Sequence, residues 1–246
     1  MKAMVLAAGL GTRLRPLTDD RPKALVEIGG RTLLEITLSR LQSFGIREVI
    51  INVHHFADMV VDYLKEKDNF GMRIEISRED VLLDTGGGLK KAAWFFLEDQ
   101  AHMDEPFLLH NVDVISTIDF CRMAHLHKEK KALALLAVQQ RESSRQLLFD
   151  SNAQLCGRRM QGKNEQVRAA KARQALAFTG IHVISPRLLM KMTEDGAFSI
   201  IDCYLRLASA GERIEAFRGE KYYWRDLCKL EQVHQANEDY RQKLFA

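Results

Sequence analysis

The chain has 246 residues, which is enough to bury a substantial core as one α/β domain or two small ones. Its net charge of +3 is small for this length, whereas a general nucleic-acid binder would carry a strong basic excess on one face. Hydrophobic residues make up 46% of the chain, yet no run approaches the roughly 20 apolar residues of a membrane span, so no membrane partner is expected.

The first part of the chain alternates between apolar runs and segments with helical spacing. Leu34, Leu38 and Leu41 recur at helical spacing, for example, and Gly45 follows where a helix would end. The expected strands are residues 3–8, 48–53, 72–79, 106–114 and 132–139, and the expected helices are residues 31–45, 57–67, 86–99 and 118–130, with a glycine-rich loop opening the third helix. Such alternation predicts a largely parallel sheet covered by helices, with ligands bound at the carboxyl ends of its strands.

The pattern changes after residue 140. Residues 146–158 read as strand, turn and strand, and residues 158–173 are polar and basic. That basic stretch has two open interpretations, a mobile lid that attracts an anionic substrate or a solvated, poorly ordered loop. Further strands are expected at residues 175–185, 213–219 and 222–224, and helices at residues 199–211 and 229–245. We expect one domain over residues 1–246, with a nucleotide-binding half (1–139) and a sugar-binding half with a terminal helix (140–246).

The four cysteines lie far apart and form no CxxC pair: Cys121, Cys156, Cys203 and Cys228. This spacing favours neither a disulfide framework nor a zinc site, and scattered reduced thiols are typical of a cytoplasmic protein. The apolar run at the N-terminus is cut short by Arg13 and Arg15, so no secretory leader is expected.

Small residues follow the first predicted strand, and cations follow them. Ala7, Ala8, Gly9 and Gly11 let a phosphate approach backbone N–H groups, Arg13 offers a forked donor, and Lys23 offers a mobile point charge. No segment matches the Walker A pattern, and Leu14 stands where a dinucleotide fingerprint needs its third glycine. The alternative to a phosphate loop is a plain turn with surface arginines.

Two further segments carry candidate chemistry. Three consecutive glycines at residues 86–88 cost backbone entropy, which suggests that a ligand or another backbone passes closely. Asp113 follows a buried apolar strand, and Mg²⁺ prefers carboxylate oxygens and few protein ligands. The alternative role for Asp113 is to cap the helix near residue 118, for which Ser116 and Thr117 are better placed.

The segments "LAAGLGTRLRPLT" and "RPKAL" together resemble the signature of the sugar-1-phosphate nucleotidyltransferases, and later motifs arrive in the expected order over nearly the whole chain. This resemblance implies an α/β, Rossmann-like three-layer nucleotidyltransferase fold. The fold would have a mixed, mostly parallel central sheet and a small β-rich excursion in the C-terminal half.

The resemblance also implies residue roles. Arg13 would steady the leaving pyrophosphate, Lys23 would contact phosphate near the reacting centre, and Asp113 and Asp226 would hold Mg²⁺. The implied nucleotide contacts are Leu6, Ala7, Ala8, Gly9, Gly11, Thr12, Arg13, Lys23, Thr85 and Gly86, and the implied sugar-phosphate contacts are Asn111, Thr179 and Gly180. For Asp226 the alternative is an ion pair with Arg225 or a nearby lysine, and for Thr179 and Gly180 it is a core strand with a bulge.

The "TGGG" form particularly resembles N-acetylmuramate-1-phosphate uridylyltransferases. The implied partners are therefore UTP and N-acetylmuramate 1-phosphate, with guanylyl transfer to mannose or heptose 1-phosphate and cytidylyl transfer to phosphocholine as alternatives. The second monoester pKa of about 6 leaves the sugar phosphate ionised, so the attack needs no histidine base. A non-catalytic sensing subunit is a further alternative, because Val112, Cys228 and Lys229 depart from the family pattern. The sequence gives no prediction of the oligomeric state.

Overall fold

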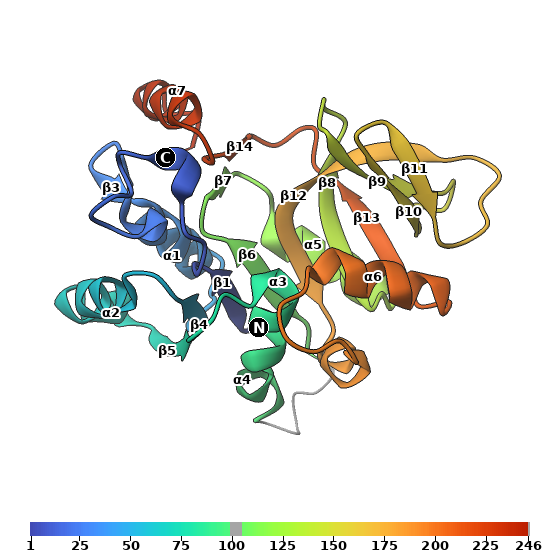
Figure 1. The fold of residues 1–246 in the computed structure, drawn as a ribbon, viewed down its shortest axis with the longest axis horizontal. Coiled ribbons are helices and arrows are strands. Elements are labelled where there is room, and N and C mark those ends of the chain that lie inside the picture. Colours follow the sequence, from blue (N-terminus) through green and yellow to red (C-terminus); the bar gives the residue numbers. More distant parts are fainter. Residues whose placement is uncertain (99–104, 246) are drawn as a thin grey trace. The chain divides into compact units, whose positions relative to one another are not determined.

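The computed structural model describes residues 1–98 and 105–245 (Figure 1). The described chain forms two compact units. Unit 1 combines Met1–Leu83, His110–Ile118 and Tyr222–Ala246, and unit 2 combines Asp84–Leu109 and Asp119–Lys221. The expected helix at residues 86–99 ends on Asp99, which lies outside the described residues.

Unit 1 is built on three parallel strands, β1 (Ala3–Leu6), β4 (Glu48–Val53) and β5 (Arg73–Arg78), with β4 in the middle. Their neighbours in sequence are helices α1 (Leu33–Ser43) and α2 (Ala57–Glu66). All four residues of β1 are buried, and Thr32 caps α1 by accepting from the N–H of Glu35 at 3.0 Å. The predicted alternation of buried strand and amphipathic helix is therefore confirmed in this part of the chain.

Shorter elements complete unit 1. They are β2 (Glu27–Ile28), β3 (Arg31–Thr32), the end of β6 (Phe107–Asn111), β7 (Val114–Ser116), β14 (Trp224–Asp226), α7 (Leu230–Arg241), and 3-10 helices at Thr12–Leu14, Lys23–Leu25 and Asp68–Gly71. Helix α7 lies against the β2–β3 turn, where Gly29 has φ +60° and a Cβ would come within 2.2 Å of the Tyr240 ring. Only glycine fits there, so the turn and the terminal helix are matched to each other.

Unit 2 contains a mixed sheet. Strand β8 (Ala134–Gln139) pairs antiparallel with β12 (Gln174–Ile184) and parallel with β13 (Ile214–Arg218). Strands β9 (Arg145–Phe149), β10 (Leu155–Met160) and β11 (Lys163–Gln166) extend it as an antiparallel meander, the predicted β-rich excursion. The helices are α3 (Asp84–Lys91), α4 (Ala93–Leu97), α5 (Phe120–Lys130) and α6 (Ile200–Ser209), with a 3-10 helix at Pro186–Lys191.

Two sequence-based expectations are wrong in unit 2. Helix α5 is capped by Asp119, whose side chain accepts from the N–H of Arg122 at 2.9 Å, and not by Ser116 or Thr117. The glycines at residues 86–88 do not form a loop before a helix, because α3 already begins at Asp84.

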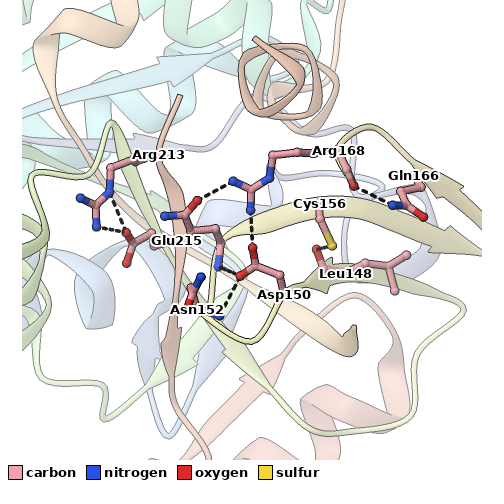
Figure 2. Close-up of polar contacts among 9 residues, drawn as sticks. Leu148, Asp150, Asn152, Cys156, Gln166, Arg168, Arg213 and Glu215 are labelled. Atoms are coloured by element: carbon pink, nitrogen blue, oxygen red, sulfur yellow. Dashed lines mark hydrogen bonds and ion pairs between the residues drawn. The ribbon is translucent and has the colours of Figure 1, made fainter. Parts of the chain in front are cut away.

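The basic stretch 158–173 is not a poorly ordered loop where β10 and β11 run through it, and its role as a lid stays a prediction. These strands turn at Gln161 and Gly162, both with positive φ, as a tight hairpin requires. Arg158 pairs with Glu165 at 2.6 Å, and Figure 2 shows the Arg168 guanidinium directed at the Asp150 carboxylate. These cations therefore hold the meander together.

Within the described ranges, no helix is both long enough and apolar enough to cross a membrane. All four cysteines are free.

Candidate active site in unit 1

The turn after β1 exposes backbone next to a buried anchor. Leu14 is fully buried and its N–H donates to the carbonyl of Gly11 at 2.8 Å, which closes the 3-10 turn at Thr12–Leu14. Gly11 has φ +67°, and the Thr18 hydroxyl donates to its carbonyl at 2.9 Å. A Cβ at Gly9, in contrast, would have no protein atom within 4 Å. The fold therefore requires a glycine at position 11, while at position 9 it leaves open backbone that a ligand can approach.

Lys23 is the cation that the fold buries here. It opens the 3-10 helix Lys23–Leu25 and is only 8% exposed, and its ammonium group pairs with the Asp113 carboxylate. A lysine so nearly buried needs a charged partner. Sequence motifs that lie 90 residues apart are thus joined in one ion pair.

Of the two predicted metal ligands, Asp226 ends strand β14 and Asp113 immediately precedes strand β7. β7 and β14 pair antiparallel with Val114 opposite Asp226, and the N–H of Leu227 donates to the carbonyl of Asp113 at 2.8 Å. Asp226 therefore lies opposite Val114, the residue that follows Asp113, in this two-stranded ribbon. In the sequence, Asp113 and Asp226 are more than a hundred residues apart.

The pKa of the Cys228 thiol depends on the charged groups near this ribbon. The pKa of its thiol is raised first by burial and then by a hydrogen bond to Asp226 and the negative charge of that carboxylate, while the positive charges of Arg13 and Lys23 oppose the rise. All three charged groups are thus close enough to act on one sulfur atom. The ion pair of Lys23 with Asp113 lies next to the ribbon that carries Asp226, and the charge of Arg13 acts on the thiol of Cys228. This places the four predicted catalytic residues in the same part of unit 1.

The ribbon fits a divalent cation. Asp226 Oδ1 is buried with no hydrogen-bond partner among the described residues, and so is Asn111 Oδ1. A buried oxygen that lacks a donor is costly unless a cation or a ligand satisfies it. The described residues contain no group of three or more histidine, cysteine or acidic side chains placed to hold a metal. Two carboxylates are consistent with Mg²⁺, which usually takes one or two and completes its shell with water and phosphate oxygens.

The residues that depart from the family pattern have structural roles. Val112 is 4% exposed, and its N–H donates to the carbonyl of Leu6 at 3.0 Å, so the side chain faces the interior. The Gln232 side chain accepts from the N–H groups of Cys228 and Lys229, at 3.2 and 3.1 Å, at the start of α7. These departures therefore support the fold, and they do not favour a site that has lost its chemistry.

Arg225 does not neutralise Asp226 in this structure. Its guanidinium instead pairs with Asp239 at 2.7 Å, and Asp239 also accepts from the hydroxyl of Tyr223 at 2.7 Å. The alternative assignment of Asp226 to an ion pair with Arg225 is therefore wrong.

A neutral histidine lies beneath the site. Burial lowers the pKa of His110 to about 4, with Arg40 acting in the same direction and Asn111 and Asp113 opposing it. The ring Nδ1 lies 2.8 Å from the Asn111 carbonyl, which can only accept, so Nδ1 carries the proton. This histidine is a packed donor at neutral pH.

Four predicted ligand contacts belong to unit 2. The Thr85 hydroxyl accepts from the N–H of Ile200 at 3.0 Å, and the N–H of Gly86 donates to the carbonyl of Phe198 at 2.9 Å. A Cβ at Gly86 would lie 2.3 Å from the Phe198 ring, so the close approach that the glycines indicated is made by another segment of the chain. The base contacts of Thr85 and Gly86 stay predictions.

The predicted sugar contacts Thr179 and Gly180 lie within β12. Thr179 is 1% exposed, and its hydroxyl donates to the carbonyl of Ala137 at 2.8 Å. Gly180 has φ +80°, where the register between β12 and β8 shifts. These observations match the bulged core strand, and sugar contact at these positions stays a prediction.

Sequence reasoning missed two buried polar residues of unit 1. Asn52 is 3% exposed near the end of β4, and Glu79 is 5% exposed just after β5. Asn52 accepts from the N–H of Ala7 at 2.7 Å, so this predicted phosphate donor is already engaged. Polar residues at the ends of two apolar strands were the available signal.

Comparison with known proteins is consistent with this site. The Nucleotidyl transferase family model matches residues 2–243. The chain is 35% identical over 217 residues to an N-acetylmuramate alpha-1-phosphate uridylyltransferase of Caulobacter vibrioides, covering 85% of each protein. It is 38% identical over 129 residues to a mannose-1-phosphate guanyltransferase of Emericella nidulans, covering 52% of this chain and 34% of that protein. HddC from Yersinia pseudotuberculosis, solved with GMP-PN, superposes with a TM-score of 0.76 at 21% identity, covering 97% of this chain and 99% of that one.

The chain therefore belongs to the nucleotidyl transferase family. It is an enzyme of the sugar-1-phosphate nucleotidyltransferase type, as the opening motif indicated. The predicted α/β fold with a mixed, mostly parallel central sheet is confirmed as well.

Proposed function

We propose that the enzyme joins UTP to N-acetylmuramate 1-phosphate and releases pyrophosphate. The relative from Caulobacter vibrioides, which matches along 85% of its own length, supports this choice of substrates. The single observation that carries the reaction class is the convergence of Arg13, Lys23, Asp113 and Asp226 in unit 1. Reduced thiols and cytoplasmic location belong to the same proposal.

The reaction brings two polyanions together, so charge is the main barrier. A phosphate oxygen of the sugar phosphate attacks the α-phosphorus in line, and pyrophosphate leaves from the opposite side. This oxygen is already largely ionised at neutral pH, so no side chain has to remove a proton from it. In our proposal, open backbone at Gly9 admits the triphosphate, Arg13 binds the leaving oxygens in a fork, and Lys23 moves its charge from Asp113 to phosphate.

Asp113 and Asp226 would hold Mg²⁺. When bound, the ion supplies positive charge that offsets the repulsion between the substrates. The unpartnered Oδ1 of Asp226 is the observation that favours this role. Asn111, whose Oδ1 is also unpartnered, is proposed to face the sugar.

Pyrophosphate release, measured over a matrix of four nucleoside triphosphates and several sugar phosphates, tests the function. The expected result is release with UTP and N-acetylmuramate 1-phosphate well above every other pair. Release with GTP and mannose or heptose 1-phosphate would replace these substrates, and so would release with CTP and phosphocholine. Release with no pair would overturn the proposed activity and leave a sensing subunit.

Replacing Asp113 with asparagine tests the carboxylate that pairs with Lys23. Asp113→Asn is expected to lower kcat by at least about a hundredfold, because charge stabilisation of this kind contributes several kcal/mol. The unfolding temperature should fall as well, because the substitution leaves the nearly buried Lys23 ammonium without its charged partner, so kcat is measured well below that temperature. Asp62→Asn, which removes an exposed carboxylate that pairs with Lys65 within α2, is the matched control and should leave kcat unchanged. Turnover of Asp113→Asn near that of the control would remove Asp113 from the site.

A further inference from the structure

A row of hydrogen bonds crosses unit 1 beneath the turn after β1. Asn52 Oδ1 accepts from the N–H of Ala7 at 2.7 Å, and Asn52 Nδ2 donates to Glu79 Oε1 at 2.8 Å. Glu79 Oε2 then accepts from the N–H of Leu83 at 2.9 Å. The row therefore joins the turn after β1, the end of β4 and the segment after β5 through two side chains that are 3% and 5% exposed.

Donors and acceptors in this row can be matched in one way only. Both ends of the row are backbone N–H groups, those of Ala7 and Leu83, and these can only donate. Asn52 accepts on one side and donates on the other, so the next group must accept on both of its sides. A carboxylate accepts with both oxygens, whereas a carboxamide does not, and Glu79 supplies the carboxylate.

A carboxylate buried in this way is expensive for the fold. Its two partners in the row are neutral, so no opposite charge there offsets the loss of water. The backbone around Glu79 is fixed as well, since its N–H donates to the carbonyl of Val53 and its own carbonyl lies 2.8 Å from Nδ1 of His54. An apolar pair would fill the same space without this cost, but it would leave the buried N–H of Ala7 and the partly buried N–H of Leu83 unsatisfied.

The segment that Glu79 holds is exposed and apolar. Val81 is 67% exposed and Leu82 is 41% exposed. The N–H of Leu83, the next residue, donates to the Glu79 carboxylate, so this hydrogen bond fixes the backbone that carries the two exposed side chains. On the other side of the row, the engaged N–H of Ala7 sets the direction in which the chain leaves β1 toward the open backbone at Gly9. The same two side chains thus determine the position of both loops.

We propose that Asn52 and Glu79 are positioning residues that hold the turn after β1 in register with the segment Asp80–Leu83, so that a nucleoside triphosphate meets a preformed loop. The inference rests on the proposed function, because it concerns binding of the triphosphate. Neither residue touches the reacting atoms, so loss of the row weakens nucleotide binding more than it slows the chemical step.

Reciprocal substitution tests the row. Glu79→Gln leaves one donor facing another donor whichever way the two amides are turned, and Asn52→Asp sets two carboxylates against each other. The double variant Asn52→Asp with Glu79→Gln restores every match and the original charge, because the new carboxylate accepts from Ala7 and from the new amide, whose oxygen accepts from Leu83. Asn164→Asp, on the exposed β10–β11 hairpin, is the control for introducing a carboxylate.

The measurements are KM for each substrate, kcat, and UTP binding by titration calorimetry. Each single variant is expected to raise the KM and Kd for UTP about tenfold, the effect of one unsatisfied buried group. The KM for the sugar phosphate and kcat should change less than about threefold, and the double variant should return the UTP constants to within about threefold of wild type. Should a single variant fail to fold, the double variant still decides, because it must fold and bind UTP as wild type does.

Unchanged UTP constants in folded single variants would overturn the inference, and so would a double variant no better than the worse single one. Such results would leave the proposed function intact, since wild type would still turn over. If wild-type protein binds no nucleoside triphosphate, the proposed function fails first, and this positioning role fails with it.

Discussion

A glycine is required for different reasons at two neighbouring positions of the turn after β1. At Gly11 the requirement comes from the fold, because φ is +67° and a Cβ would lie 3.0 Å from Thr18 Cγ2. At Gly9 the protein itself imposes no such restriction, because a Cβ there would meet open space. The fold thus accounts for the glycine at position 11, and Gly9 keeps its proposed role in phosphate binding.

This difference predicts opposite behaviour for two alanine variants. Gly11→Ala should destabilise the protein by about 1–2 kcal/mol, the cost of a left-handed backbone for an L-residue. Gly9→Ala should leave the unfolding temperature unchanged and raise the KM for UTP several-fold, because a methyl group would occupy the approach of a phosphate. Thermal unfolding and initial-rate kinetics on both variants provide the check. An intact KM with lower stability in Gly9→Ala would contradict the assignment.

The residues proposed to carry the chemistry could be named from the sequence, whereas the residues that hold their backbone in place could not. Residue type and order sufficed for Arg13, Lys23 and Asp113, because phosphate and magnesium restrict which side chains are useful. The role of Asn52 depends instead on which N–H faces its side chain, and that is set by the pairing of β1 with β4. A register between distant strands leaves little trace in a single sequence.

Among the elements, the periodicity of the sequence predicted most strands and helices. The start of α3 was predicted wrongly, because residues 86–88 were expected to form a loop. Three glycines disfavour a helix by roughly 1 kcal/mol each, so local propensity placed them in a loop. Tertiary contacts override this preference, since the N–H groups of Gly86 and Gly87 donate to the carbonyl of Phe198. Strand β10 was partly predicted, but β11 was missed, because its four polar residues give no period-2 apolar signal.

Helix α3 yields a prediction that runs against helix propensity. Gly86→Ala should destabilise the protein although alanine is the better helix former, because the new Cβ would lie 2.3 Å from the Phe198 ring and 2.9 Å from its carbonyl oxygen. The clash with the ring is removed in Phe198→Ala, so the double variant should lose less stability than the two single losses added together. Urea unfolding of the four proteins measures this coupling, and simple additivity would exclude the proposed contact.

At the scale of the whole molecule, two buried histidines link stability to acidity. Burial lowers the pKa of His110 and of His127 to about 4, from an ordinary value of 6.5. Above pH 6.5 neither histidine is charged in the folded or the unfolded chain. Between pH 6.5 and 4 these two histidines are protonated in the unfolded chain but remain neutral in the folded chain. Falling pH therefore favours unfolding.

We therefore expect the free energy of unfolding to decrease from pH 7 to pH 4.5, with each histidine contributing up to about 1.4 kcal/mol per pH unit. His127→Gln should flatten this dependence, because glutamine takes up no proton in this range. Urea unfolding at pH 7, 6, 5 and 4.5 measures the slope. Exposed His125→Gln is the control and should keep the wild-type slope. An equal slope in His127→Gln would show that other groups govern the acid sensitivity.

The β7–β14 ribbon has a consequence for the order in which the protein matures. Strand β14 comes from Tyr222–Ala246, the last of the three stretches that make unit 1, and it carries Asp226. During synthesis the turn after β1 leaves the ribosome early, whereas Asp226 follows Asp113 only after more than a hundred further residues have been translated. A nascent chain should therefore be able to shape the turn after β1 well before it completes the ribbon that we propose to hold magnesium.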